Sequence, residues 1–177
     1  FIQRFVLGFR VAIFTTATDY TVDQPLSTDI GKNISICLNG HTLYASKQAI
    51  LVNWESTITI CDCSKGKTGS IQGTDANRSD LFLVRRDDDD EDEDSGTLLL
   101  NGCKLSGVWG VENCGGTFEA VNVTAVMERA FLYGDDGYEA KITDSNISRL
   151  ISPSKIVRPI TNARFTPAIS VVFGCSR

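Results

Sequence analysis

Several residue types and motifs are scarce or missing in this chain, and their scarcity excludes several classes of function. Its 177 residues include one histidine, one methionine, two tryptophans and four prolines. The lone His41 and a CysAspCys segment at 61–63, without paired CysXaaXaaCys motifs, argue against a tetrahedral zinc site. Arg4 and Arg10 interrupt the most apolar stretch, 1–14, so no run approaches the roughly 20 apolar residues of a membrane span. No basic stripe interleaved with aromatic residues is present, so nucleic-acid binding is not expected.

The negative charge is concentrated in one segment. Residues 87–94 are all acidic, and without these eight charges the formal net charge changes from −5 to +3. We expect an acidic loop insertion over 85–96 with one of three roles: a solvated loop of mutually repelling charges, a calcium site, or a contact with basic residues of another subunit. Calcium is the only cofactor that this pattern suggests. Its ligands would be Asp87, Asp88, Asp89, Asp90, Asp92 and Asp94.

The most informative pattern is a short apolar phrase ending near a polar turn, which occurs six times. Taking one apolar position in each phrase as equivalent gives steps of 28, 34, 18, 24 and 22 residues. A period in the twenties indicates stacked units, because one such unit cannot bury its apolar face alone. The positions taken as equivalent are Leu43, Ile71, Leu105, Val123, Ile147 and Ile169.

A second set of apolar runs lies between the phrases, at 49–52, 81–84, 108–111, 130–133 and 155–158. Two strands per unit predict an all-β fold, a right-handed parallel β-helix of about six coils. The alternative is an antiparallel sandwich, which also has many short strands separated by turns. The predicted core consists of Ile36, Leu38, Leu43, Ile50, Ile60, Leu100, Leu105, Phe131 and Ile147.

The chain is long enough for one domain with a continuous core. We expect the β-helix domain over 20–177 and an N-terminal cap or assembly segment over 1–19, where 1–14 fits either a helix or a strand. Apolar side chains at both ends suggest either truncation or end-to-end assembly of subunits. The predicted contact joins Phe5, Phe9 and Ile13 of one subunit to Val171, Val172 and Phe173 of the next.

Six cysteines in a β-rich chain indicate an oxidising compartment, although fifteen pairings are available. The segments 34–37 and 58–61 align at a step of 24 residues, which makes Cys37 and Cys61 lateral neighbours on stacked coils. We therefore predict a Cys37–Cys61 disulfide, with two free stacked thiols as the alternative.

Four AsnXaaSer/Thr sequons are present, at Asn33, Asn77, Asn122 and Asn146. In a secretory pathway these asparagines would be glycan acceptors. In the repeat alignment Asn122 and Asn146 occupy one coil position, which would instead make them stacked turn asparagines.

Three stretches in the first part of the chain resemble a known family. They are IleCysLeuAsnGlyHisThrLeu at 36–43, IleThrIleCysAspCysSer at 58–64 and the glycine-rich turn at 69–73. Together they make the segment from Tyr20 to Gly73 similar to the opening coils of right-handed parallel β-helix (pectate-lyase-like) domains in secreted and surface-anchored microbial proteins. The acidic insertion and the apolar start depart from that pattern. The resemblance implies the fold, but β-helices host lyases, hydrolases and adhesins alike.

The sequence contains no convincing catalytic constellation. Asp135 and Asp136 form an adjacent acidic pair, but the GlyHisGly motif of pectin-hydrolysing β-helices is absent, and GlyAspAspGly is typical of a plain turn. We expect a non-catalytic extracellular structural or adhesive module, secreted or at the cell surface, whose partners are further copies, other surface proteins or carbohydrate. The alternative is a polysaccharide lyase or glycoside hydrolase using Asp135, Asp136 or Asp144. A groove on the outer face lined by carboxylates and aromatic side chains would favour that alternative.

Overall fold

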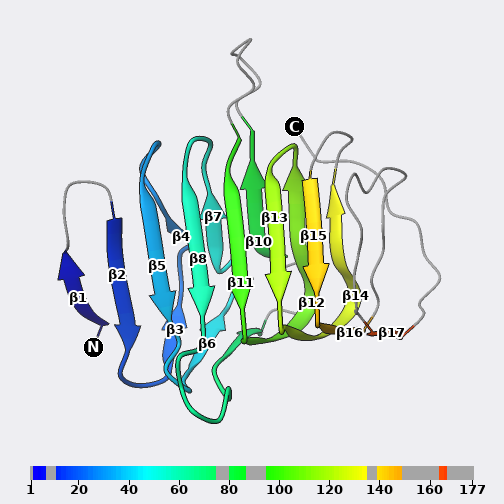
Figure 1. Cartoon of the computed structure of the whole chain (residues 1–177), viewed down its shortest axis with the longest axis horizontal. Helices are drawn as coiled ribbons and strands as arrows, with labels where there is room; N and C mark the ends of the chain where they lie inside the picture. Colours follow the sequence, from blue (N-terminus) through cyan, green and yellow to red (C-terminus); the bar gives the residue numbers. More distant parts are fainter. Residues whose placement is uncertain are drawn as a thin grey trace.

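The structure is a computed structural model that describes residues 2–6, 11–74, 80–86, 95–134, 139–148 and 164–166. For 2–6, 11–13 and 164–166 the description covers the backbone only. All elements in these residues are β-strands (Figure 1). The described residues contain no helix that is long and apolar enough to cross a membrane.

The strands in chain order are β1 (Ile2–Val6), β2 (Val11–Thr16), β3 (Tyr20–Val22), β4 (Leu26–Ser27), β5 (Asn33–Cys37), β6 (Thr42–Ala45), β7 (Ile50–Val52), β8 (Thr57–Cys61), β9 (Ser70–Gly73), β10 (Asp80–Arg85), β11 (Thr97–Asn101), β12 (Lys104–Cys114), β13 (Thr117–Val121), β14 (Thr124–Gly134), β15 (Glu139–Thr143), β16 (Asn146–Ser148) and β17 (Arg164–Thr166).

The chain winds through two sheets in turn. Sheet A has the order β1-β2-β5-β8-β11-β13-β15, and sheet B has the order β17-β16-β14-β12-β10-β7-β4 with β3, β6 and β9 at its side. The strands of sheet A run opposite to those facing them in sheet B, while the chain advances along the long axis (Figure 1). This is a right-handed solenoid, and six coils begin in sheet A within the described residues, at β2, β5, β8, β11, β13 and β15.

Parallel pairing distinguishes the solenoid from the alternative sandwich. Every pairing between named strands is parallel except that of β1 with β2. Parallel neighbours need a crossover connection, which each coil supplies by passing through the other sheet. The predicted all-β parallel β-helix is therefore confirmed.

In-register stacking builds the core from ladders of equivalent side chains. Every residue predicted to be inside is buried. The two ladders of sheet A that point inward are Ile34–Ile58–Leu98–Phe118–Ala140 and Ile36–Ile60–Leu100–Ala120–Ile142. Because alternate residues of a strand face opposite sides, the positions between them point outward.

The sequence alignment was right for part of the sheet B ladder and wrong for two positions. Leu43, Ile71 and Leu105 are in register, but the next equivalents are Ala125, then Ile147, then Phe165. The predicted Val123 is therefore wrong, and Phe165 takes the position predicted for Ile169, which lies outside the described residues. Val123 is buried in the corner after sheet A, where its N–H bonds Ser145 Oγ, so its apolar character reflects the corner and not the strand.

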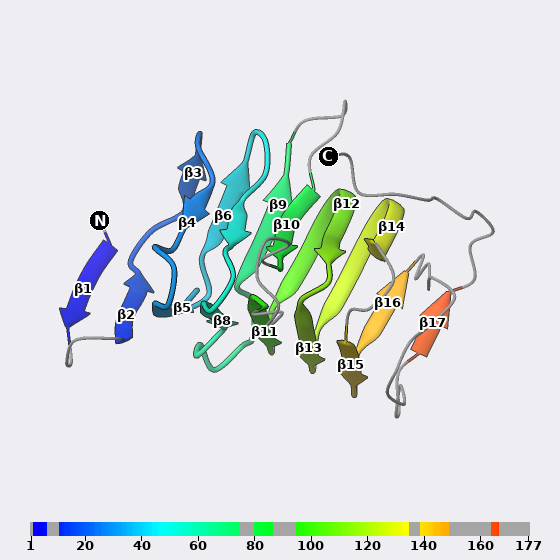
Figure 2. The ribbon, with the colours of Figure 1, turned by 90° about the horizontal axis from the view of Figure 1, so that it is seen from above.

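The N-terminal segment is strand and not helix. β2 pairs in parallel with β5 over Val11–Thr15, so sheet A extends into the segment expected to be a separate cap. β1 then folds back antiparallel on β2 with Phe5 opposite Ile13, and it is the terminal strand of the sheet in Figure 2.

The acidic insertion falls between β10 and β11 in the sequence. Its base is closed by the antiparallel bridge of Arg86 with Ser95 and by a 2.7 Å hydrogen bond from Gly96 N–H to the Arg85 carbonyl. Residues 87–94, and with them the candidate calcium ligands, lie outside the described residues.

A buried asparagine secures the corner between β12 and β13. The Asn113 side chain is fully buried and forms two hydrogen bonds with one residue: Nδ2 donates to the Gly116 carbonyl at 3.1 Å, and Oδ1 accepts from Gly116 N–H at 2.8 Å. The amide gives the Gly116 N–H an acceptor, and it adds a second donor to the Gly116 carbonyl, which also accepts from Glu139 N–H at 3.1 Å.

Replacing Asn113 by alanine should lower the free energy of unfolding by about 1–3 kcal/mol, because the buried Gly116 N–H loses its acceptor and the Gly116 carbonyl keeps only the hydrogen bond from Glu139 N–H. Denaturant unfolding followed by circular dichroism measures this. The matched control is Asn101→Ala at the exposed end of β11, which should stay within about 0.5 kcal/mol of the parent. Equal effects of the two substitutions would contradict the assignment.

Candidate functional site

Four cysteines meet where sheet A ends and the chain turns toward sheet B. Cys37 ends β5 and Cys61 ends β8, and the two are in register, as the sequence predicted. Asn101 of β11 is the next residue in that row, and Cys103 follows it by two positions, as Cys63 follows Cys61. We call Cys37, Cys61, Asp62, Cys63 and Cys103 the cysteine corner.

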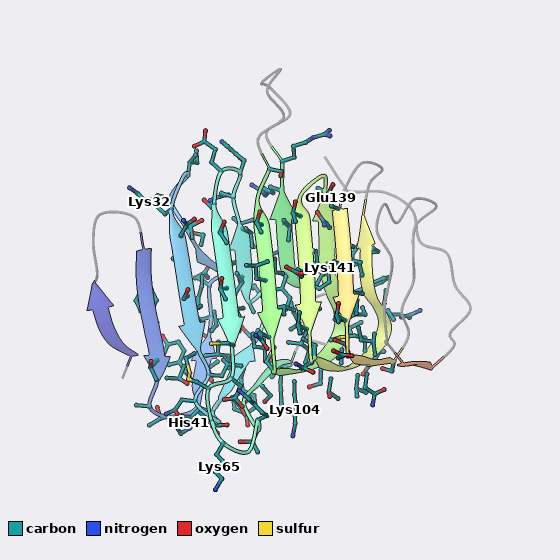
Figure 3. The ribbon with its side chains drawn as sticks, in the orientation of Figure 1. Lys32, His41, Lys65, Lys104, Glu139 and Lys141 are labelled. Carbon is teal, nitrogen blue, oxygen red and sulfur yellow. A yellow bond between two sulfur atoms is a disulfide. The ribbon has the colours of Figure 1, made fainter. Side chains whose placement is uncertain are left out.

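The cysteine corner lies at the edge of the solenoid where the strands of sheet A end, the edge along which Figure 3 labels His41, Lys65 and Lys104. The opposite end of the sheet A strands carries Lys32 and Glu139 (Figure 3). The loop 62–69, which connects β8 to β9, belongs to this corner and, together with the acidic insertion, makes the third coil longer than its neighbours.

A disulfide joins Cys37 to Cys63, with a Cα–Cα distance of 5.9 Å, so the predicted Cys37–Cys61 pair is wrong. The register behind the prediction was correct, but it could not include the path of the 62–69 loop. Asp62 in that loop accepts a hydrogen bond from Gly40 N–H, just beyond β5, which brings the loop, and Cys63 with it, back to Cys37. Cys61 is left as a half-buried free thiol, and Cys103 as a buried one.

Asp62 is the centre of the corner. It is completely buried, and its two oxygens accept four hydrogen bonds. Oδ1 accepts from Gly40 N–H at 2.9 Å and Ser64 N–H at 3.0 Å, while Oδ2 accepts from Ser64 Oγ–H at 2.9 Å and Gly69 N–H at 2.6 Å. The carboxylate thereby fastens both ends of its own loop to the turn of the preceding coil.

Burial by itself would raise the pKa of Asp62, but the hydrogen bonds from Ser64, Gly69 and Gly40 together outweigh it and hold that pKa below its usual value. The carboxylate is therefore ionised at neutral pH. All four donors stabilise the ionised carboxylate. Asp62 therefore acts as a hydrogen-bond acceptor that holds the corner together.

Two neighbours fit closely around this carboxylate. A Cβ atom on Gly69 would lie 2.7 Å from both Asp62 Cγ and Leu38 Cβ, so only glycine allows the backbone to approach this far. Lys67 Nζ donates to the Asp62 carbonyl, and its aliphatic chain runs past Gly102. The charge of Lys67 is thus held next to the free thiol of Cys61.

The two free thiols differ in environment. Burial raises the pKa of Cys61; the nearby Lys67 opposes this, and Asp62 adds to it. Burial raises the pKa of Cys103 to about 12, and the nearby charges of Cys61 and Asp62 contribute in the same direction. Cys103 is only 1% exposed and belongs to the core, whereas Cys61 reaches the surface layer.

His41 lies on the surface of the same corner. Its Nδ1 is 3.5 Å from Asp19 Oδ1, an oxygen that also accepts a hydrogen bond from Thr42 N–H at 2.9 Å. Both side chains are partly exposed, so this pair contributes little to stability.

The other predicted site residues are not brought together with the cysteine corner. Asp144 is exposed at a positive φ of 49°, and it occupies the same corner position as Asn122 (54°) and Gly102 (65°) in the preceding coils. This left-handed position makes the turn out of sheet A, and asparagine, aspartate and glycine tolerate it best. Asp135 and Asp136 lie outside the described residues, and within the described part no group of three or more histidine, cysteine or acidic residues could hold a metal ion.

Three of the four sequon asparagines are described, and all three are exposed: Asn33, Asn122 and Asn146. Asn77 lies outside the described residues. The expected shared position of Asn122 and Asn146 is wrong, because Asn146 pairs with Thr124 of β14. Asn33 Oδ1 accepts a hydrogen bond from Thr57 N–H at 3.2 Å.

The sequence analysis missed a second cluster, which lies on β10, β12 and β14 of sheet B. The rings of Trp109 and Tyr133 have centroids 5.0 Å apart, and the Tyr133 hydroxyl donates to Asp80 Oδ1. Tyr133 and Ala130 are buried apart from the main core. The only signal in the sequence was that Trp109 and Tyr133 fall in two consecutive members of the second set of apolar runs, 108–111 and 130–133.

Comparison of the chain with protein-family models, with curated proteins and with solved structures finds no match.

Replacing Asp62 by asparagine should lower the free energy of unfolding at neutral pH by about 1–3 kcal/mol. Each carboxylate oxygen accepts from a backbone N–H, so an amide NH₂ must face a donor in either orientation. Denaturant unfolding at neutral pH measures the loss. Ser64→Ala is a matched variant, because it removes one of the four bonds and should cost less.

The same pair of proteins should differ in pH dependence. Because the folded-state pKa of Asp62 is depressed, its contribution is present above the unfolded value of about 3.9 and is lost as the pH falls toward the folded value. The difference in unfolding free energy between parent and Asp62→Asn should therefore shrink as the pH falls below about 4. A difference that stays constant on acidification would contradict an ionised, hydrogen-bonded Asp62.

Proposed function

We propose that this chain is a non-catalytic structural or adhesive β-helix module of the extracellular space or cell surface, related to the β-helix domains of secreted microbial proteins that its opening coils resemble. The observation that carries the proposal is the fastened cysteine corner. The corner's buried carboxylate and its disulfide both serve to hold coils together.

The Cys37–Cys63 disulfide supports the location outside the cell. It closes a loop of 26 residues between two consecutive coils. A cross-link of this span stabilises a fold by about 3–4 kcal/mol through the unfolded chain, and such bonds persist in oxidising compartments. Exposed sequons at Asn33, Asn122 and Asn146 are consistent with glycosylation where the host has that pathway.

The outer face of sheet A supports a role in contact and not in chemistry. Its outward positions form columns of mostly short polar side chains, and Figure 3 shows this face uncovered by any other described element. One column includes Asn33, Thr57, Thr97 and Thr117, and Glu139 follows Thr117 in it. A regular hydroxyl-bearing face of this kind suits other surface proteins or carbohydrate as partners.

End-to-end assembly remains part of the proposal. β1 is the terminal strand of sheet A, and an edge strand can pair with another chain. Phe5 and Ile13 lie on paired strands there, whereas Phe9, Val171, Val172 and Phe173 lie outside the described residues. A head-to-tail contact does not close on itself, so it would propagate into a filament.

One observation favours the enzymatic alternative, a polysaccharide lyase or glycoside hydrolase. Asp80, Trp109 and Tyr133 combine a carboxylate with two aromatic rings on strands of sheet B, and the partly buried Trp109 is the ring on which a sugar would stack.

Two measurements on the same preparation test the proposal. Analytical ultracentrifugation should show concentration-dependent association that a chain lacking residues 1–10 has lost, with its β-sheet circular dichroism intact because β2 is retained. Incubation with acidic polysaccharides should release no new sugar ends.

A monomer at all concentrations would refute the assembly, and cleavage that Asp80→Asn or Asp144→Asn abolishes would establish the enzyme instead.

A further inference from the structure

The cysteine corner places one free thiol beside a disulfide that it can attack. Cys61 is in register with Cys37 on the neighbouring strand, and it is two residues from Cys63. We propose that the corner is a thiol–disulfide exchange site, in which Cys61 displaces Cys63 from Cys37 and leaves Cys63 as an exposed thiol open to covalent modification.

Both pairings satisfy the geometry of a disulfide. The observed Cys37–Cys63 pair has a Cα–Cα distance of 5.9 Å. In-register residues of adjacent strands are separated by about 4.8 Å, which also lies within the disulfide range of about 4.4–6.8 Å. Cys37 therefore has two partners within reach.

The backbone of the corner stays in place during such an exchange. Asp62 lies between the two competing cysteines, and its N–H bonds the Asn101 carbonyl while its side chain bonds Gly40, Ser64 and Gly69. The residue between Cys61 and Cys63 is thus fixed on both sides. Only the three cysteine side chains need to rotate.

The step balances without an external oxidant or reductant. The Cys61 thiol gives its proton to water, and its sulfur attacks Cys37 Sγ. The Cys37–Cys63 bond breaks as the Cys37–Cys61 bond forms, and Cys63 leaves as a thiolate that takes up a proton. One disulfide replaces another, and one free thiol replaces another.

The exchange changes the surface of the protein. A free thiol moves from half-buried Cys61 to exposed Cys63, beside the exposed Lys65 and Lys67. The groups facing Cys61 are Asp62, Lys67 and Cys103, and burial raises the pKa of its thiol, so little thiolate is present at neutral pH. Exchange should therefore be slow at neutral pH and faster in mildly alkaline solution. The thiol released at Cys63 is a site for soft electrophiles and small-molecule disulfides.

The proposed exchange is tested by labelling the protein with N-ethylmaleimide under non-reducing, mildly alkaline conditions. The sample is then quenched with acid, and its peptides are analysed by tandem mass spectrometry. Fragmentation on either side of Asp62 distinguishes a label on Cys61 from one on Cys63. The parent should give labelled Cys63 together with a Cys37–Cys61 cross-link. Cys61→Ser should label Cys63 at least about tenfold less, because no attacking thiol remains. Parent Cys63 labelling no higher than in Cys61→Ser overturns the proposal.

Two further variants separate geometry from attack. Cys63→Ser should form the Cys37–Cys61 disulfide directly, and if both cysteines are free in this folded variant, the proposal is overturned. Cys103→Ser is the matched control, because it removes the other free thiol nearby and should leave labelling of Cys63 unchanged. Loss of that labelling in Cys103→Ser would assign the attack to Cys103 and overturn the role of Cys61.

Discussion

Parallel, in-register hydrogen bonding between coils is the constraint on which the rest of this structure depends. Each coil must place an apolar side chain opposite its equivalent in the next coil, as Ile36, Ile60 and Leu100 do. A shift of one residue in any strand would exchange its inward and outward faces, because side chains alternate. The register therefore fixes which residues form the core, which face the solvent and which meet at the corners.

Variation in coil length is confined to the corners and to insertions between strands. Between Leu43 and Phe165 the equivalent residues of sheet B are separated by 28, 34, 20, 22 and 18 positions, although the strands remain in register. The first of these steps contains the loop 62–69, and the second contains the acidic insertion. Loop-closure entropy grows slowly with length, so a solenoid tolerates such insertions if the chain is fastened where they begin and end. Asp62 and the Arg86–Ser95 bridge provide that fastening.

Local pattern was sufficient to predict the strands and their inward faces but not the contacts between loops. The alternation in Ile34–Ile36 and Ile58–Ile60 predicts both the burial and the register of β5 with β8. Val123 was misaligned because corner positions as well as strand positions point inward, so apolar character alone cannot separate them. The disulfide was assigned to Cys61 instead of Cys63 for a different reason. The choice depends on a hydrogen bond between Asp62 and Gly40, 22 residues apart, for which the repeat pattern contains no signal.

The position of the cysteines follows from the same constraint. A disulfide from Cys37 to Cys63 spans 26 residues, and one from Cys37 to Cys61 would span 24, so both join the same two coils. In the chain-entropy description the two loops differ in stabilisation by less than about 0.1 kcal/mol. The balance between them is therefore set by the local environments of the sulfur atoms and not by the stability of the solenoid. This is the circumstance in which a fold can change the thiol that it presents at its surface while every coil stays in register.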